Sequence, residues 1–592
     1  MSRHAISRGD KAATKPGRSD RRLRPPARPA GRRSRPPLRR AARTAAVTAA
    51  AAVAPVRPAP TDWLTRVRQP DIRLFARWWL TVFAGSLVLF LARFLLPSPV
   101  GMADNGDGPR LLCGLGVAPV TGGLPRYDGF AYFTFTPSAG CVNADVYPSS
   151  EHLLLAGARD LTPPLQLPGM LNLIALGLIT CVLQSAGIAS LACGLRLRWR
   201  YTVLLAAALW LIMADAAFFD TYASPYSEGA TLTGLLLLGA GILYLGRGPL
   251  GFTLGLVLTG AGGYLAVLSK EQYLLLVIPV GAVLLAASAS RSDRGLARLL
   301  TARMAAAAVV AGLLVAGAVG YMRQDASSPY TATLHQEQVV DVIFSDIVDG
   351  HDNAAADLHA LGLPASWAKY AGTNFWAPHS VYHDPLYPRY ASKLTDGNLV
   401  RFLVTHPADV ISIGQRAANG ALQLRVDYLG NYQPDAGHPA GTLEDRVTVL
   451  TSLVQAIPAG LGLLWLLPLW AAMAAIAAWA LRITRHAPGW HRDAAFAIVA
   501  LVGCAVAGFI PAGYFDGIEI TRHMLGSNLA TALAFVFAAL LLASLVRRGI
   551  RSAAATDSSR EPLAPILVPA QACPPDSAPS GERAGGARHR LD

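Results

Sequence analysis

Apolar residues along the chain come in runs of about 20, the length that an α-helix needs to cross a bilayer. Short polar connections separate most of these runs, and one long polar stretch covers about residues 323–450. The pattern predicts an all-α polytopic membrane protein with about ten transmembrane helices and a mostly helical outer loop domain. The spans are expected to begin near Trp78, Pro168, Tyr201, Gly229, Leu250, Gln272, Arg303, Leu453, Ala494 and Leu525.

The same pattern divides the chain into parts with different compositions. Both ends are low-complexity sequence without the apolar residues for a core, so we expect disordered tails. The glycine-rich span from Leu250 is expected to pack closely against its neighbours. The predicted parts are a tail at 1–74, spans one to seven at 75–322 with a first outer loop at 97–167, the loop domain at 323–450, spans eight to ten at 451–547, and a tail at 548–592.

Composition and charge agree with a membrane protein. Hydrophobic residues make up 53% of the chain and charged residues 15%, whereas soluble domains carry about 25% charged residues. The net charge of +15 comes from the N-terminal tail and from alternate connections such as Arg196–Arg200 and Arg482–Arg492, so it does not indicate nucleic acid. The positive-inside rule places these connections and both termini in the cytoplasm of a multi-pass cell-membrane protein.

The remaining connections then face outward. They include the first loop, the long loop and the turns Phe219–Glu228, Ser269–Gln272 and Tyr514–His523. Two of the six cysteines, Cys113 and Cys141, share the first loop. An outer compartment permits disulfides, but the sequence leaves open whether these two are bridged. No Cys/His spacing indicates zinc.

The stretch GMADNGDGPR follows the first span and carries the sharpest candidate chemistry. Asp104 or Asp107 could act as a general base that takes a proton from a sugar hydroxyl, which then attacks an anomeric carbon. Asn105 and the two carboxylates could alternatively bind a divalent metal, Mg or Mn, or form a solvated Asx-type turn. Arg110, which follows, is a candidate substrate-binding residue. The sequence does not decide which aspartate would be the base.

The turn Phe219–Glu228 combines acids with aromatic rings. Asp220, Tyr222, Tyr226 and Glu228 are candidates for sugar binding, because rings stack on the apolar face of a sugar and carboxylates accept from its hydroxyls. The alternative is that the tyrosines anchor helix ends at the membrane interface.

Cations occupy two further outer turns. Lys270, beside Glu271, could hold a phosphate as a point charge, or the two could form a solvated ion pair. Arg522 and His523 lie on the side where positive charge is less expected, and arginine binds phosphate through its planar fork of donors. Acids, rings and cations on one face favour chemistry on a lipid-phosphate-linked sugar.

The arrangement resembles the GT-C class of integral-membrane glycosyltransferases, and within it the WsfD-type hexose transferases of bacterial glycan biosynthesis. In that class an acidic motif in the first outer loop supplies the catalytic base, and Asp104 and Asp107 occupy the matching place. The resemblance implies a polyprenyl-phosphate sugar donor and a glycan or glycolipid acceptor. It covers about residues 75–547 and rests on the stretches ADNGDGPR, SKEQ, HPADV, DYLGNYQ and ITRHMLG.

We therefore expect a hexosyltransferase that works on the outer leaflet for the cell envelope. The alternatives are a flippase or transporter of lipid-linked sugars, a glycan polymerase or ligase, and a non-catalytic scaffold. Transporters place ionisable groups near the bilayer centre, whereas Arg93 and Asp215 lie near span ends here. That distribution favours surface chemistry.

Overall fold

The computed structural model describes residues 72–558, apart from 120–127, 139–140, 142–145, 290–296, 328–330, 350–352 and 485–488. The two predicted tails lie largely outside these residues. Their inner borders differ from the expected ones. The first helix, α1, already begins at Ile72, and the last helix, α20, runs from Leu525 to Ser558, past the expected end of span ten.

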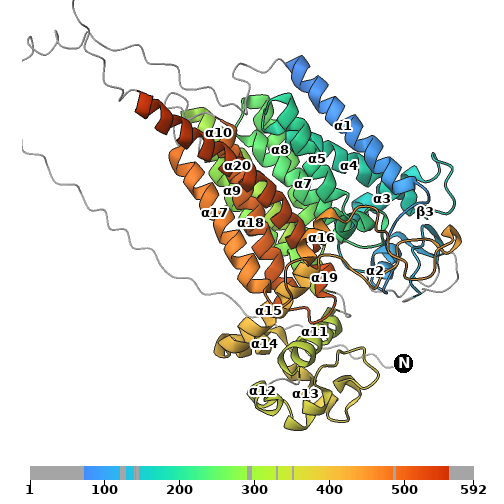
Figure 1. Ribbon diagram of the computed structural model, residues 1–592. Helices are drawn as coiled ribbons and strands as arrows, with labels where there is room; N and C mark the ends of the chain where they lie inside the picture. The colour runs from blue at the N-terminus through green and yellow to red at the C-terminus, as the bar shows by residue number, and fades with distance from the viewer. Residues whose placement is uncertain are drawn as a thin grey trace, which may run out of the picture. The chain divides into compact units, whose positions relative to one another are not determined.

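Long apolar helices dominate the described part of the chain and run side by side in Figure 1. Within the described residues, nine of them are long and apolar enough to cross a membrane, and one bent pair raises the number to ten. The polytopic all-α fold is thereby confirmed. The nine are α1 (Ile72–Leu95), α4 (Leu173–Gly194), α7 (Glu228–Leu245), α8 (Pro249–Val267), Glu271–Ala289 including α9 (Val277–Ala289), α10 (Ala297–Ala326), α17 (Gly462–Ile483), α18 (Trp490–Tyr514) and α20.

The bent pair is α5 (Trp199–Met213) and α6 (Ala216–Phe219), and Asp215 explains the bend of 59° between them. One carboxylate oxygen of Asp215 accepts from Ala217 N at 3.2 Å, and the other accepts from Leu450 N at 2.7 Å. Asp215 thus caps both α6 and the short helix α16 (Val449–Gln455). The next span begins at Gly462, later than expected from Leu453, because α16 ends before a turn at Gly460 with φ of 87°.

The helix α7 is the centre of the bundle, since all its residues from Glu228 to Leu245 are buried. It packs against α8 through glycines on both helices. A Cβ atom at Gly234 would lie 2.4 Å from Ala266 N, and one at Gly262 would lie 2.5 Å from Leu238 N. Only glycine permits this approach, so the expected close packing of the glycine-rich span is confirmed.

Short helices between α10 and α17 form the loop region, and α12 to α14 lie beyond one end of the long helices in Figure 1. The region has its own core around the buried rings of Phe344 and Trp367. The last of its longer helices, α15, instead buries Ala417 and Ala418 against the long helices. The helices are α11 (Thr331–Asp341), α12 (Ala354–Ala360), α13 (Tyr387–Tyr390), α14 (Asp396–Thr405) and α15 (Pro407–Gln423).

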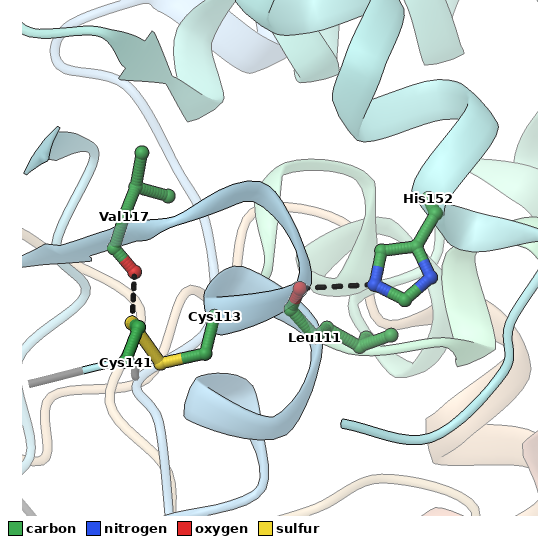
Figure 2. The surroundings of a disulfide bond; sticks show 5 residues. All are labelled: Leu111, Cys113, Val117, Cys141 and His152. Atoms are coloured by element: carbon green, nitrogen blue, oxygen red, sulfur yellow. Dashed lines mark hydrogen bonds between the residues drawn. A yellow bond between two sulfur atoms is a disulfide. The ribbon is translucent and has the colours of Figure 1, made fainter. Parts of the chain in front are cut away.

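The first loop, between α1 and α4, holds a small antiparallel sheet in the order β1–β2–β3. Figure 2 shows that Cys113 and Cys141 of this loop form a disulfide, which answers the question that the sequence left open. His152 Nε2 lies 3.0 Å from Leu111 O and ties α3 to the same loop. The loop elements are α2 (Gly108–Leu112), β1 (Val117–Pro119), β2 (Thr134–Pro137), α3 (Glu151–Leu161) and β3 (Leu171–Asn172).

Candidate functional site

Several of the predicted segments meet at one end of the helix bundle, around the guanidinium of Arg522. This end is where α1 stops, where α7 begins and where the short helix α19 (Ile520–His523) lies. Residues from the first loop, from α7, from the turn before α9 and from the segment around α19 all approach Arg522. We call this group the Arg522 cluster, and it consists of Arg522 with Asp107, Glu228, Lys270, Glu519 and His523.

Arg522 is a buried cation surrounded by carboxylates. Its side chain is only 2% exposed, and Nη2 lies 2.5 Å from Asp107 Oδ2 and 2.7 Å from Glu519 Oε2. Nε lies 3.9 Å from Glu228 Oε1. Burial alone would lower the pKa of Arg522, but these carboxylates raise it well above its ordinary value. The guanidinium is therefore permanently charged and holds three segments of the chain together.

Lys270 and His523 extend the cluster toward solvent. Lys270 Nζ lies 3.5 Å from Glu228 Oε1 and donates to His523 Nε2 at 2.9 Å, while His523 Nδ1 pairs with Asp516. Because a lysine ammonium can only donate, His523 Nε2 is the acceptor in the contact with Lys270. The side chain of Lys270 is 20% exposed, so of the two cations it is the one that a ligand can reach.

Asp104 differs from the other carboxylates because no cation pairs with it among the described residues. Its Oδ1 accepts from Gly106 N at 2.8 Å and from Gly108 N at 2.9 Å, which leaves Oδ2 without a hydrogen bond to the described chain. Burial raises the pKa of Asp104 to about 6, against the lowering effect of the two backbone N–H groups. An ionisable oxygen with such a pKa suits a general base near neutral pH.

Asp107 has the opposite electrostatic environment. Burial opposes its ionisation, but the charges of Arg522 and Lys270 outweigh this effect and hold the pKa of Asp107 below its usual range. Its carboxylate is thus ionised and engaged by Arg522. The geometry separates the two aspartates that the sequence could not tell apart.

The acidic loop is fixed on both sides of Asp104 by the buried Tyr226. The Tyr226 hydroxyl accepts from Asn105 N at 2.7 Å and donates to Ala103 O at 2.9 Å. Its ring lies under the guanidinium of Arg522, 4.7 Å from ring centre to Cζ. Tyr226 is 2% exposed, so it positions the loop and offers no ring face to a sugar.

Two other residues of the same turn belong elsewhere. Asp220 lies 3.4 Å from Arg425 Nη2, and Tyr222 donates to Met213 O at 2.9 Å within the apolar core. Within the described residues, neither side chain bonds to Asp104 or Arg522. We call the group to which Asp220 belongs the Arg425 network, and it consists of Arg425, Asp220, Asn431, Glu444, Asp445 and Arg93.

The Arg425 network holds the start of the first loop. Asn431 Oδ1 lies 3.2 Å from Arg425 Nη2 and accepts from Glu444 N at 2.9 Å. Asn431 Nδ2 donates to Gly101 O at 2.8 Å, and Gly101 N donates to Asn431 O at 3.1 Å. Arg93 Nη2 lies 2.5 Å from Glu444 Oε2. These bonds anchor α1 and the chain that leads to Asp104.

Glu271 and Arg110 contact residues outside the Arg522 cluster, although the charge of Arg110 helps to lower the pKa of Asp107. Glu271 Oε1 lies 3.4 Å from His335 Nε2 on α11, and Arg110 lies over the ring of Tyr147 at 4.7 Å. Of the sequence-predicted residues, the structure brings together Asp104, Asp107, Asn105, Tyr226, Glu228, Lys270, Arg522 and His523.

Sequence reasoning missed one residue of the cluster, Glu519. Glu519 bonds to Arg522 and to Asn105 Nδ2, and accepts from the Tyr428 hydroxyl at 2.8 Å. It does so from a left-handed backbone conformation with φ of 55°, which costs energy for a residue with a Cβ atom. Its position three residues before Arg522 was the only signal in the sequence.

Glu151 on α3 was also missed. It is 1% exposed and accepts from Ala230 N at 2.6 Å, in the first turn of α7. Burial raises the pKa of Glu151 to about 8. Nothing near it in the sequence indicates that its partner lies at the mouth of α7.

The residues of the first-loop motif do not fit a divalent cation. Asp107 is engaged by Arg522, and Asn105 Oδ1 lies within hydrogen-bond distance of Tyr226, Asp107 N and Arg522. In the part of the chain that the structure describes, the one group of three possible metal ligands within reach of each other is Glu271, Asp325 and His335.

Comparison with known proteins identifies the part of the chain that contains this site. A protein-family model described as the YfdI N-terminal transmembrane domain matches residues 72–554, which include all the long helices and the Arg522 cluster. Searches of the curated proteins and of the solved structures gave no match.

Proposed function

Since the chain belongs to the YfdI N-terminal transmembrane domain family, we propose that the Arg522 cluster is the active site of a GT-C-type membrane glycosyltransferase. The enzyme moves a hexose from a polyprenyl-phosphate donor to a glycan or glycolipid of the cell envelope, as the WsfD-type transferases do. The proposal rests on the surroundings of Asp104. This carboxylate has one free oxygen, and it lies where several long helices begin or end, beside the fixed cations Lys270 and Arg522.

The chemistry assigned to Asp104 is general base catalysis. Asp104 Oδ2 takes the proton of an acceptor hydroxyl while that oxygen attacks the anomeric carbon of the donor. A new glycosidic C–O bond forms and the bond between the anomeric carbon and the phosphate oxygen breaks. The electron pair leaves with the polyprenyl phosphate.

The leaving phosphate needs positive charge as its own negative charge develops. Lys270 is the partly exposed cation of the cluster and is assigned to the phosphate. Arg522 is almost fully buried and is assigned to fixing Asp107, Glu519 and Glu228 around the reaction centre. This division chooses Lys270 where the sequence left Lys270 or Arg522 as the phosphate ligand.

The positive-inside pattern supports an outer-leaflet reaction. Arginine-rich connections such as Arg196–Arg200 join helices at the end of the bundle opposite the Arg522 cluster. If that end is cytoplasmic, both termini are cytoplasmic and the cluster faces outward. A disulfide in the loop that carries Asp104 is consistent with an oxidising compartment.

A flippase for lipid-linked sugars is the competing assignment, and one experiment separates the two. The purified chain is placed in liposomes with a radiolabelled polyprenyl-phosphate hexose and a membrane glycan fraction. Transfer predicts label in the glycan fraction together with released polyprenyl phosphate. Movement of intact donor between leaflets, without label in the glycan fraction, would replace the proposal with the flippase.

A further inference from the structure

An open groove of about 440 Å³ lies beside the Arg522 cluster and is lined in part by Glu519, which pairs with Arg522. One wall is the polar face of α15, which presents Asn419 and Gln423 at helical spacing. The other wall is the chain from Gly517 to Thr521, and Tyr428 lies at its edge. The volume falls within the range of about 300–1,000 Å³ that is usual for small-molecule sites.

The groove carries polar groups with unused hydrogen-bonding capacity. Asn419 Oδ1 accepts from Gln415 Nε2 at 3.0 Å and from Gly462 N at 3.2 Å, which fixes the amide. Its Nδ2 then has no partner in the hydrogen bonds of the described chain, and it remains available as a donor. Asp427 accepts from Gln423 through Oδ2 at 3.0 Å, so its Oδ1 remains available as an acceptor.

Tyr428 adds an accessible aromatic ring, since the residue is 46% exposed. Its hydroxyl is fixed by Glu519 Oε1 at 2.8 Å, which orients the ring. A fixed ring beside a free amide donor and a free carboxylate acceptor matches a saccharide, whose apolar face stacks on the ring while its hydroxyls bond to the polar groups. No cation of the groove is available for a phosphate, because Arg416 is engaged by Asp346 and Asp349.

The groove shares Glu519 with the Arg522 cluster. Glu519 bonds to the Tyr428 hydroxyl in the groove and to Asn105 in the first loop, and Asn105 is the neighbour of Asp104 in the chain. A saccharide against Tyr428 would therefore lie next to a side chain that contacts the loop of Asp104. We propose that this groove is the acceptor subsite and that it binds a neutral hexose saccharide; the acceptor role rests on the function proposed above.

Saccharide binding is tested without any reaction. The full chain in lipid nanodiscs is mixed with maltose, cellobiose and α-1,6-mannobiose, and saturation transfer from protein to sugar protons is recorded by NMR. We expect transfer to at least one disaccharide. The double variant Asn419→Leu, Tyr428→Ala should abolish it, whereas Ser412→Leu, an exposed residue on the same helix outside the groove, should not. No signal with the wild type, or an equal signal with the double variant, would overturn the proposal.

The acceptor role is tested by separating two outcomes of donor cleavage. With Asn419→Leu, which leaves the bond between Tyr428 and Glu519 in place, label transfer to the membrane glycan fraction should fall about tenfold, while release of free hexose to water stays unchanged. Tyr428→Phe, which keeps the ring, should retain most transfer. A parallel fall of both products would contradict an acceptor subsite. If the wild type cleaves no donor at all, the proposed function fails, and the NMR experiment still decides whether the groove binds a saccharide.

Discussion

Two buried arginines at the same end of the bundle organise two different polar regions. Arg425 and its partners Asp220 and Glu444 are 8%, 2% and 0% exposed, and Asn431 joins them to the backbone of the first loop. Arg522 is just as buried, but its partner Asp107 is 37% exposed, and Asp104 nearby has a free oxygen. The same residue types thus anchor the first loop in one place and surround a carboxylate with a free oxygen in the other.

The difference shows that the role of a polar residue at a helix mouth depends on its connections and not on its type. A carboxylate that is buried against a buried cation holds the fold together. A carboxylate that is fixed by one oxygen and free at the other is prepared to act on a ligand. The following changes test whether the two regions are separable in this way.

Replacing each arginine by glutamine should produce the largest contrast. Arg522→Gln should lower the transfer rate per folded molecule by about 10²–10³, because the carboxylates around the reaction centre lose the cation that holds them in place. Arg425→Gln should leave transfer per folded molecule within a few-fold but lower the unfolding free energy by about 3–5 kcal/mol, since Asp220 would remain buried without its cation.

Both quantities should be measured on detergent-purified protein, with transfer normalised to the folded fraction from thermal unfolding. Equal losses of transfer per folded molecule in the two variants would mean that the two regions do not differ in function.

Lys270→Gln should weaken donor binding with a smaller effect. A charge-assisted hydrogen bond contributes about 1.5–3 kcal/mol, so we expect KM for the polyprenyl-phosphate donor to rise by about 10–100-fold. Lys270→Arg should recover part of the loss because it keeps the charge. Unchanged donor KM with a lower kcat would assign Lys270 to the arrangement of Glu228 and His523 instead of the phosphate.

Transfer and stability should depend on pH in different ranges, because the pKa of Asp104 is raised and the pKa of Glu444 is lowered. The pKa of Asp104 is raised to about 6, so the base becomes protonated as the pH falls, and transfer at pH 5 should be about tenfold lower than at pH 7. Burial acts to raise the pKa of Glu444, but Arg93 and Arg446 outweigh it and lower the pKa. Its stabilising contribution is therefore present above pH 4.5 and is lost only below that value.

Transfer rates and unfolding temperatures over pH 4–8 separate these effects. Loss of transfer that follows the loss of fold, with no earlier decline near pH 6, would argue against Asp104 as the titrating base.

Removing the disulfide should have the smallest effect on transfer. Cys113→Ser combined with Cys141→Ser opens a bridge between residues 28 positions apart, which should lower the unfolding free energy by about 2–4 kcal/mol. Transfer should change less than about twofold, because Tyr226 and Asn431 still hold the loop around Asp104. A large loss of transfer at full folding would show that the bridge itself positions the base.

Much of the fold follows from the sequence because each span is specified locally. Runs of apolar residues predict the long helices, and the glycines of α8 predict close packing, which the structure shows against α7. The late start of α17 was missed because it depends on Asp215, which caps α16 from more than 200 residues away. Such a partner cannot be inferred from a local pattern.

The site was predictable as a set of segments but not as a set of contacts. Asp220, Tyr222 and Glu228 are all sugar-binding candidates in the sequence, yet Asp220 pairs with Arg425, Tyr222 packs in the core, and Glu228 lies near Arg522. Which of these residues reaches the site depends on the direction of each side chain and on cations that lie hundreds of residues later in the chain.

The most direct test of the central claim compares Asp104→Asn with Asp107→Asn in a single assay. Asparagine keeps the Oδ1 acceptor for Gly106 N and Gly108 N, so Asp104→Asn removes the base and preserves the loop. At matched amounts of folded protein, transfer of radiolabelled hexose should fall by about 10³ with Asp104→Asn and by about tenfold with Asp107→Asn, which weakens only the pair with Arg522. Wild-type transfer by Asp104→Asn would contradict the account, whatever the behaviour of Asp107→Asn.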